Sequence, residues 1–438
     1  MSTANREAVR GDREAVRVAV LADSDTRWKW GALTARRITP AGTRPEGYLL
    51  RGRATPTARQ LAETAGARTA DTGGAPREVT GAEFLRVLAE EGYDVVVLAL
   101  VGGTVQAVLH GLAGLGPARR PVVVTGYVGV VYEKLADGLL LRHGADVVLA
   151  NSAADARRFR AVYEGVGADA SAVVQAALPF LGGARHTPEP GRDTLVFAAQ
   201  PSVPATRAER AYLLERLVRH AELHPKREVV LKLRSKPGEH TTHIEELPYQ
   251  KLAARRPLPA NLALAYGHMG ELLDRTDLLV TVSSTAALES LHRGVPTAVL
   301  TDFGVREALG NHHFIGSGLL ASFDHLDEGR RPEADPDWLA DHGVHPAGSS
   351  PAYERAFDAA RDRVLTLLGE PVLPPPRPYY TAATAPGYLP GVLARHRLDA
   401  PPSPAPSRAR RALRNAARGA YRHGVQRVAP VIRRLGEL

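Results

Sequence analysis

The sequence predicts an α/β protein made of two domains, each with a parallel sheet that helices cover on both faces. Short apolar runs of strand length alternate with amphipathic helical stretches, and this alternation breaks at residues 188–192 and then starts again. Unbroken apolar strands are typical of parallel sheets that are buried on both faces. A chain of 438 residues is also too long for one ordinary domain.

The first domain is expected over residues 15–187. The clearest strand is 94–100, an apolar run that turns at a glycine pair into a helix over 104–112. A second helix, 152–163, begins at a polar capping pair and ends at a glycine. The remaining strands are expected at 17–22, 48–50, 121–125, 146–149 and 172–175, and the remaining helices at 28–38 and 81–91.

The second domain is expected over residues 192–370 and repeats the pattern. Its strands are expected at 194–198, 228–233, 261–266, within 276–282 and at 297–300, and its helices at 205–220, 269–275, after residue 285 and at 352–368. The polar, acidic stretch 324–345 is interpreted as a surface excursion.

Two segments of different composition follow. Residues 371–406 hold 11 prolines, too many for a helix or sheet, and are expected to form a linker or a strap on the body. Residues 407–438 form a basic tail with an apolar stripe at helical spacing, so the net charge of +9 belongs mostly to the tail. The tail is open to three interpretations: a helix on an anionic membrane surface, a solvated segment, or a nucleic-acid binder. The last is disfavoured because residues 1–406 carry 47 basic and 46 acidic side chains.

Composition excludes several kinds of chemistry. Cysteine is absent, which removes disulfides, zinc–thiolate sites, iron–sulfur clusters and cysteine nucleophiles. Residues 1–14 lack the apolar segment of a signal peptide, and no run of 18 apolar residues could span a membrane. The expected location is therefore cytoplasmic. Pairs of histidines at helical spacing lack the rest of a metal motif, so we expect neither a metal nor a cofactor.

The most informative motif is the hydroxyl cluster Ser283-Ser284-Thr285. It stands between a buried strand and a helix that ends at Gly294. A helix N-terminus presents unpaired N–H groups and partial positive charge, and small hydroxyl residues let a phosphate approach closely. The sequence therefore predicts an anion site at the carboxyl end of a parallel strand, although the same residues could simply cap the helix.

A second set of polar residues lies in the first domain. Asp23 and Asp25 follow the first strand, where one could act as a general base, although aspartate there is also a common turn or cap residue. Glu133 and His143 are reserve candidates for the base. Trp28, close to a second tryptophan, is predicted to give a stacking surface for an acceptor, with core packing as the alternative. Gly102 and Gly103 follow the strong strand and are expected to border the same acceptor side.

Taken together, these motifs resemble the GT-B glycosyltransferases, which have two doubly wound domains around a cleft. Residues 283–296 are similar to a segment of bacterial polysialyltransferase-like and glycerophosphotransferase-like enzymes, and residues 17–31 resemble an actinobacterial family of glycosyltransferases. The resemblance covers about residues 15–370. It implies that Ser283, Ser284 and Thr285 bind the phosphates of the donor and that Glu289 contacts its ribose.

The basic run Lys232, Arg234 and Lys236 follows another strand of the second domain. The related enzymes have a histidine here, where this chain has Arg234 and Lys236. Fixed cations can still stabilise the charge of a leaving nucleotide phosphate without a metal, although an exposed basic loop is the alternative.

The resemblance implies transfer of a sugar or sugar-like group from a nucleotide-activated donor to a hydroxyl acceptor, such as a cell-envelope or lipid-linked glycan. The expected partners are therefore this donor, a glycan acceptor and, through the tail, the inner face of a membrane, but no nucleic acid. Two alternatives stay open: another GT-B nucleotide-sugar enzyme such as an epimerase, and a non-catalytic binding or scaffold protein at the membrane.

Overall fold

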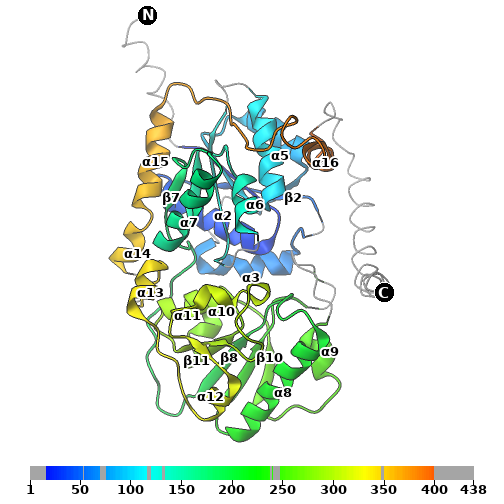
Figure 1. Cartoon of the computed structure of the whole chain (residues 1–438), viewed down its shortest axis with the longest axis vertical. Helices are drawn as coiled ribbons and strands as arrows, with labels where there is room; N and C mark the ends of the chain where they lie inside the picture. The colour runs from blue at the N-terminus through cyan, green and yellow to red at the C-terminus, as the bar shows by residue number, and fades with distance from the viewer. Residues whose placement is uncertain are drawn as a thin grey trace, which may run out of the picture.

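Two α/β halves lie one above the other along the long axis of the molecule (Figure 1), as the sequence predicts. The structure is a computed structural model that describes residues 16–52, 54–69, 75–115, 120–130, 134–236, 239, 247–346 and 350–398. Each half contains one sheet, and every strand pairing in both sheets is parallel.

The first sheet has seven strands in the order β3-β2-β1-β4-β5-β6-β7. Its order reverses beside β1, so the carboxyl ends of β1 and β4 border a crevice of the kind in which open α/β sheets bind ligands. The strands are β1 (Val18–Ala22), β2 (Glu46–Leu50), β3 (Arg77–Val79), β4 (Val95–Ala99), β5 (Val122–Gly126), β6 (Val147–Ala150) and β7 (Val173–Gln175). The helices of this half are α2 (Asp25–Ile38), α3 (Ala58–Thr69), α4 (Gly81–Glu91), α5 (Gly102–Ala113), α6 (Leu135–Leu140) and α7 (Ala153–Gly165).

The second sheet has six strands in the order β10-β9-β8-β11-β12-β13, with the same reversal beside β8. Its strands are β8 (Thr194–Ala198), β9 (Glu228–Lys232), β10 (Leu262–Ala265), β11 (Leu278–Thr281), β12 (Thr297–Leu300) and β13 (Leu320–Ala321). Its helices include α8 (Arg207–Leu223), α9 (Tyr249–Ala253), α10 (Met269–Leu273), α11 (Ala286–His292) and the short 3₁₀ turns Glu307–Leu309 and Asn311–Phe314.

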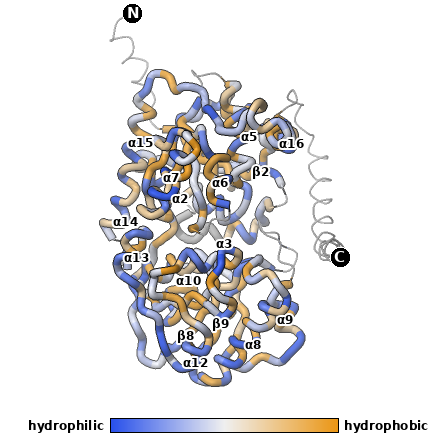
Figure 2. Tube along the Cα trace, in the orientation of Figure 1, coloured by the Kyte–Doolittle hydropathy of each residue, from blue (hydrophilic) through white to orange (hydrophobic). Residues whose placement is uncertain are grey.

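The central strands are buried along their whole length because helices cover both faces of each sheet. All residues of β1, β4, β5, β8 and β11 are buried. Figure 2 shows that the hydrophobic stretches gather inside each half, while hydrophilic stretches follow the outer turns. This burial holds the strand ends that carry the polar residues in fixed positions.

The stretch 324–345 is not a plain surface excursion, which corrects the sequence prediction. It contains α13 (Pro336–Asp341) and most of α12 (Phe323–Asp327). Leu326 and Trp338 are buried, and Trp338 stacks on Phe314 with ring centroids 5.7 Å apart. The prediction is wrong because the stretch is mostly polar and contains only a few apolar residues that pack into the core.

The chain then returns from the second half to the first. Helices α14 (Pro351–Arg355) and α15 (Asp358–Gly369) belong by sequence to the range expected for the second domain. In the structure α15 packs on α2 and on the strands β5, β6 and β7 of the first sheet (Figure 1). Tyr353 donates a hydrogen bond to the carbonyl of Leu178 at 2.7 Å, which fastens this return segment to the first half.

The proline-rich segment forms a strap over residues 371–398. Its backbone carbonyls accept hydrogen bonds from side chains of the first half: Arg120 Nε donates to Pro374 at 2.5 Å, and Gln106 Nε2 donates to Tyr380 at 3.0 Å. Contrary to the sequence prediction, the strap contains a helix, α16 (Leu389–Arg395), which begins with a proline in its first turn and packs on α5 (Figure 1). The tail predicted over 407–438 lies outside the described residues. No helix in the described part of the chain is both long and apolar enough to cross a membrane.

Candidate functional site

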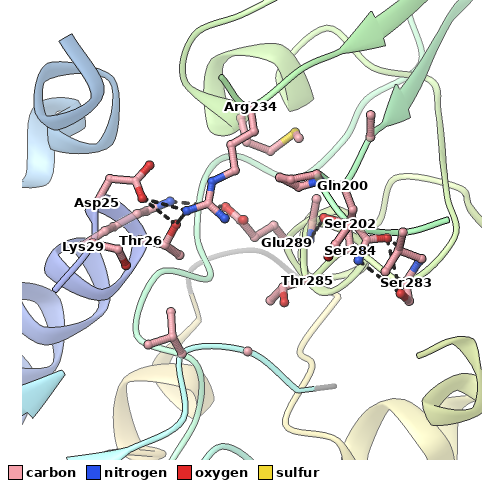
Figure 3. Close-up of a pocket in the computed structure, with 18 of the residues that line it drawn as sticks. Asp25, Thr26, Lys29, Gln200, Ser202, Arg234, Ser283, Ser284, Thr285 and Glu289 are labelled. Atoms are coloured by element: carbon pink, nitrogen blue, oxygen red, sulfur yellow. Dashed lines mark hydrogen bonds and ion pairs between the residues drawn. The ribbon is translucent and has the colours of Figure 1, made fainter. Parts of the chain in front are cut away.

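A pocket of about 510 Å³ lies between the two halves. It is lined by the segments that follow the carboxyl ends of β1 and β5 in the first sheet and of β8, β9, β10 and β11 in the second. The start of α2 and residues of α3 complete the wall of the first half. Figure 3 shows polar side chains from both halves pointing toward one another across this pocket.

The hydroxyl cluster forms one wall of the pocket, as predicted. Ser283 is held by Gln200, whose Oε1 accepts a hydrogen bond from the Ser283 backbone N–H at 3.0 Å. Ser284 Oγ accepts a hydrogen bond at 3.2 Å from the N–H of Ala286, the first residue of α11. Thr285 lies directly across from Gly129 of the first half, where a β-carbon would come 3.0 Å from the threonine oxygen. The cluster therefore lines the pocket, and its Ser284 also holds the start of α11.

Glu289 extends the same wall one turn along α11. Its carboxylate is paired across the pocket with Lys29 of α2, with 3.7 Å between Lys29 Nζ and Glu289 Oε2. The ammonium of Lys29 also lies 4.9 Å from the ring centre of Phe180. A ligand hydroxyl that reached Glu289 would therefore meet a carboxylate whose position is already fixed from the other half.

Two cations of the predicted basic run lie in the pocket. Lys232 is the last residue of β9 and is 7% exposed, and its ammonium donates to the carbonyl of Leu233 at 2.7 Å. Burial lowers the pKa of Lys232 to about 8, with the nearby cations Arg234 and Arg59 acting in the same direction. Arg234 follows β9 and reaches across to the first half (Figure 3). The pocket thus carries buried positive charge next to the hydroxyl cluster.

The third member of the basic run lies elsewhere. Lys236 is exposed and does not line the pocket, and its ammonium lies 5.7 Å from the ring centre of Tyr266. Its backbone N–H donates to Glu239 at 2.8 Å. Lys236 therefore lies outside the pocket that holds Lys232 and Arg234, and its contact with the donor stays a prediction.

Asp25 is the first-half carboxylate that meets these groups. It is the first residue of α2, with Ser24 as the cap, and its Oδ1 accepts a hydrogen bond from Arg234 Nη2 at 2.7 Å. Burial acts to raise the pKa of Asp25, but the charge of Arg234 and the backbone N–H of Thr26 outweigh it, so the pKa is lowered. Asp25 is therefore ionised at neutral pH.

Asp23 does not line the pocket. Its carboxylate accepts from Arg27 Nη1 at 2.8 Å and from the backbone N–H of Val101 at 3.0 Å, which ties the end of β1 to the end of β4. Of the two predicted bases the pocket geometry favours Asp25. Of the reserve candidates, His143 does not line the pocket, and Glu133 lies outside the described residues.

The predicted acceptor residues are also corrected. Trp28 is 4% exposed and belongs to the core of the first half, where it packs so closely on Gly47 that a β-carbon there would overlap the indole. Gly102 packs against Leu141, and Gly103 lies under the Tyr388 hydroxyl of the strap. None of the three lines the pocket.

Sequence reasoning missed several residues of the pocket. Gln200 follows the carboxyl end of β8, so the rule that identified Ser283 could have found it. Lys29 shares the first turns of α2 with Asp25. Glu63 comes from α3, a helix that the sequence analysis did not predict.

A separate cluster has the composition of a metal site. Ligand atoms of His220, His224 and Asp327 lie within 4.8 Å of one another. Asp327 accepts from His220 Nδ1 at 2.7 Å and from Arg216 at 2.8 Å, and Arg227 donates to the other nitrogen of His220 at 2.9 Å. These hydrogen bonds account for both nitrogens of His220 and make the cluster an ion-pair network that fastens α12 to α8.

Comparison with solved structures supports a GT-B fold for the molecule. The chain is similar to S. aureus MnaA, solved with UDP, with a TM-score of 0.54 and 12% identity over 81% of this chain and 98% of that one. It is also similar to UDP-GlcNAc 2-epimerase from Neisseria meningitidis, bound to UDP-GlcNAc, with a TM-score of 0.52 and 11% identity over 81% of this chain and all of that one. At such low identity the likeness establishes the fold alone.

Sequence comparison adds the family. A search of curated proteins found no match. A family model described as "Putative glycosyltransferase (DUF6716)" matches residues 18–359, a range that contains both sheets and every residue of the pocket. The chain is a GT-B protein that belongs to this glycosyltransferase family.

Proposed function

We propose that this protein transfers a sugar or sugar-like group from a nucleotide-activated donor to a hydroxyl acceptor. One observation carries the proposal: a pocket between the two sheets joins a hydroxyl cluster, a carboxylate and two cations of the second half to the ionised Asp25 of the first. The family assignment supports transfer. Proteins of the same fold solved with UDP and with UDP-GlcNAc support a nucleotide-sugar donor.

The second half would hold the donor. We assign the phosphates to Ser283, Ser284 and Thr285, and the ribose hydroxyls to Glu289. As the bond to the sugar breaks, negative charge develops on the leaving phosphate, and Arg234 and Lys232 would stabilise it. Because these cations already supply the positive charge, we propose a reaction that needs no metal.

The first half would supply the base and receive the acceptor. Asp25 is ionised and lies on the opposite wall, so it could take the proton of an acceptor hydroxyl. The two halves already touch across the pocket through Lys29 and Glu289, and this closure would keep water from the activated donor. A cell-envelope or lipid-linked glycan is the acceptor that we propose, since the Arg-rich tail suits an anionic membrane surface.

Thermal-shift measurement against CMP, CDP, UDP, GDP and TDP tests the donor site. We expect one nucleotide to stabilise the wild-type protein clearly. Arg234→Ala should reduce this stabilisation by at least half, and Ser284→Ala should reduce it while lowering the melting temperature slightly, because the hydrogen bond at the start of α11 is lost.

Lys236→Ala is the matched control for Arg234→Ala. It removes the same charge two residues away, from an exposed side chain outside the pocket, and should leave the nucleotide response unchanged. The proposed donor site would be contradicted if no nucleotide raised the melting temperature, or if a nucleotide raised it equally in all variants. Conversion of a nucleotide sugar to an isomer without any acceptor would point to an epimerase instead.

A further inference from the structure

The proposed base and the proposed leaving-group cation are bound to each other. Arg234 Nη2 donates to Asp25 Oδ1 at 2.7 Å and also contacts Thr26 Oγ1. The side chain of Asp25 is 10% exposed and that of Arg234 is 31% exposed, so the bridge lies partly inside the pocket with Arg234 on its open side. Figure 3 shows the guanidinium of Arg234 crossing from the second half to the start of α2.

In this arrangement Asp25 and Arg234 are engaged by each other through Oδ1 and Nη2. A carboxylate that accepts a charge-assisted hydrogen bond from a guanidinium is a weak proton acceptor, because protonation would break the bridge. Nη2 of Arg234, which donates to Asp25 and Thr26, is not available to a phosphate beside the hydroxyl cluster. A phosphate placed beside Ser283 to Thr285 would compete with Asp25 for the same cation, since arginine binds carboxylate and phosphate through the same N–H groups.

We infer that Asp25 and Arg234 form a bridge that the donor opens, so that the phosphate of the donor takes Arg234 and releases Asp25 as the base. This inference rests on the proposed function and adds an order of events to it. Before the donor binds, Asp25 is held by Arg234. After it binds, Asp25 is free to accept a proton from the acceptor, and the bond from Arg234 to the phosphate replaces the bond to the carboxylate.

The surroundings of Asp25 suit such a release. Asp25 occupies the first turn of α2, a helix of 14 residues, so the helix N-terminus keeps stabilising the carboxylate when Arg234 leaves. A second ion pair across the pocket has a similar arrangement. Lys29 of α2 pairs with Glu289, the residue that we propose binds the ribose of the donor. Donor binding would therefore exchange protein–protein pairs across the cleft for protein–donor contacts.

A permanent structural bridge would behave differently, and nucleotide affinity separates the two. If Asp25 competes with phosphate for Arg234, Asp25→Asn should bind nucleotide about 3- to 30-fold more tightly than the wild type, although it cannot act as a base. If the bridge only holds the halves together, Asp25→Asn should bind nucleotide equally well or more weakly.

The experiment measures dissociation constants by calorimetry for inorganic pyrophosphate and for the nucleotide that gives the largest thermal shift. The variants are Asp25→Asn, Arg234→Ala and the double variant. The inference expects tighter binding in Asp25→Asn, weaker binding in Arg234→Ala, and a clearly smaller gain from Asp25→Asn when Arg234 is absent. Asp23→Asn is the control, since it removes the same charge two residues away from a carboxylate outside the pocket.

Each outcome decides something. If Asp25→Asn binds nucleotide as well as the wild type or more weakly, the inference that the donor opens the bridge is rejected, while the proposed donor site is retained. The inference is also rejected if Asp23→Asn increases nucleotide affinity as much as Asp25→Asn does, or if Asp25→Asn gives the full increase when Arg234 is absent. Loss of one negative charge near the pocket would then explain the increase. Pyrophosphate binding that depends on Asp25 without any nucleotide binding would keep the bridge and reject the proposed donor. Binding of neither ligand would reject both.

Discussion

At the scale of single residues, Lys232 shows how a buried cation links binding to pH. Its pKa of about 8 lies below the ordinary value because the ammonium is almost fully buried. This burial disfavours folding as long as the group is charged. This free-energy cost to folding applies in full below pH 8. It decreases as the pH rises from about 8 toward the pKa of lysine in the unfolded chain, so the contribution of Lys232 makes the protein more stable at high pH.

Nucleotide binding should have the opposite pH dependence. A bound phosphate favours the charged form of Lys232, so affinity should fall as the pH rises through about 8, by up to about tenfold per pH unit. Calorimetric titration between pH 7 and 9 checks this. Lys232→Arg should remove the inflection, because arginine stays charged over this range. The same pH profile in both proteins would show that another group is responsible.

Sequence reasoning predicts the residues of the second-half wall of the pocket better than those of the first-half wall. Ser283, Ser284, Lys232 and Arg234 were found because polar residues at the carboxyl ends of parallel strands lie beside a ligand crevice whatever the rest of the fold does. Trp28 was misplaced because the same rule says nothing about which side of a helix faces the core. Its indole fills the space above Gly47, a contact between segments 19 residues apart.

At the scale of elements, apolar strands were the most predictable feature. The runs at 194–198 and 297–300 have the same bounds in the structure as in the sequence analysis, since a short buried strand needs little more than an unbroken apolar run. Helices α3 and α12 were missed because their apolar residues are few and their helical character depends on packing. Glu63 of α3 was missed with its helix.

The packing of the strap could not be predicted either. Its proline-rich composition predicts an irregular segment but does not show which of its residues pack on the first half. Leu373, Pro376, Leu389 and Val392 of the strap are buried. Gln106, which donates to the strap, is fully buried and would lose this partner if the strap were removed.

A chain that ends at residue 370 should therefore be less stable than a chain that ends at 398. We expect a loss of at least about 2 kcal/mol, from the apolar surface and the hydrogen bonds that become exposed. Thermal and urea unfolding of both chains measure the difference, and the chain that ends at 398 is the control because it keeps all of the strap that the structure describes. Equal unfolding midpoints would show that the strap lies on the first half without stabilising it.

At the scale of the whole molecule, the sequence predicts two domains but not how the chain joins them. The return of α15 to the first sheet was not foreseen, since a helix over 352–368 looks the same on either domain. Arg37 of α2 pairs with Glu354 at 2.8 Å, so the return segment is fixed to the helix that carries Asp25 and Lys29.

The basic tail is the part of the molecule that would place this pocket near its acceptor. Residues 407–438 carry nine arginines and one glutamate, while the rest of the chain is close to neutral. We expect the full chain to co-sediment with vesicles that contain phosphatidylserine, less at high salt and hardly at all with neutral vesicles, because the attraction is electrostatic.

Deletion of 407–438 should abolish this co-sedimentation without changing the thermal response to nucleotide, since the pocket lies wholly within residues 24–310. Replacing the nine arginines with lysine should preserve vesicle binding, and replacing them with glutamine should remove it. Unchanged sedimentation after the deletion would reject a membrane role for the tail. Loss of the nucleotide response would instead show that the tail acts on the pocket itself.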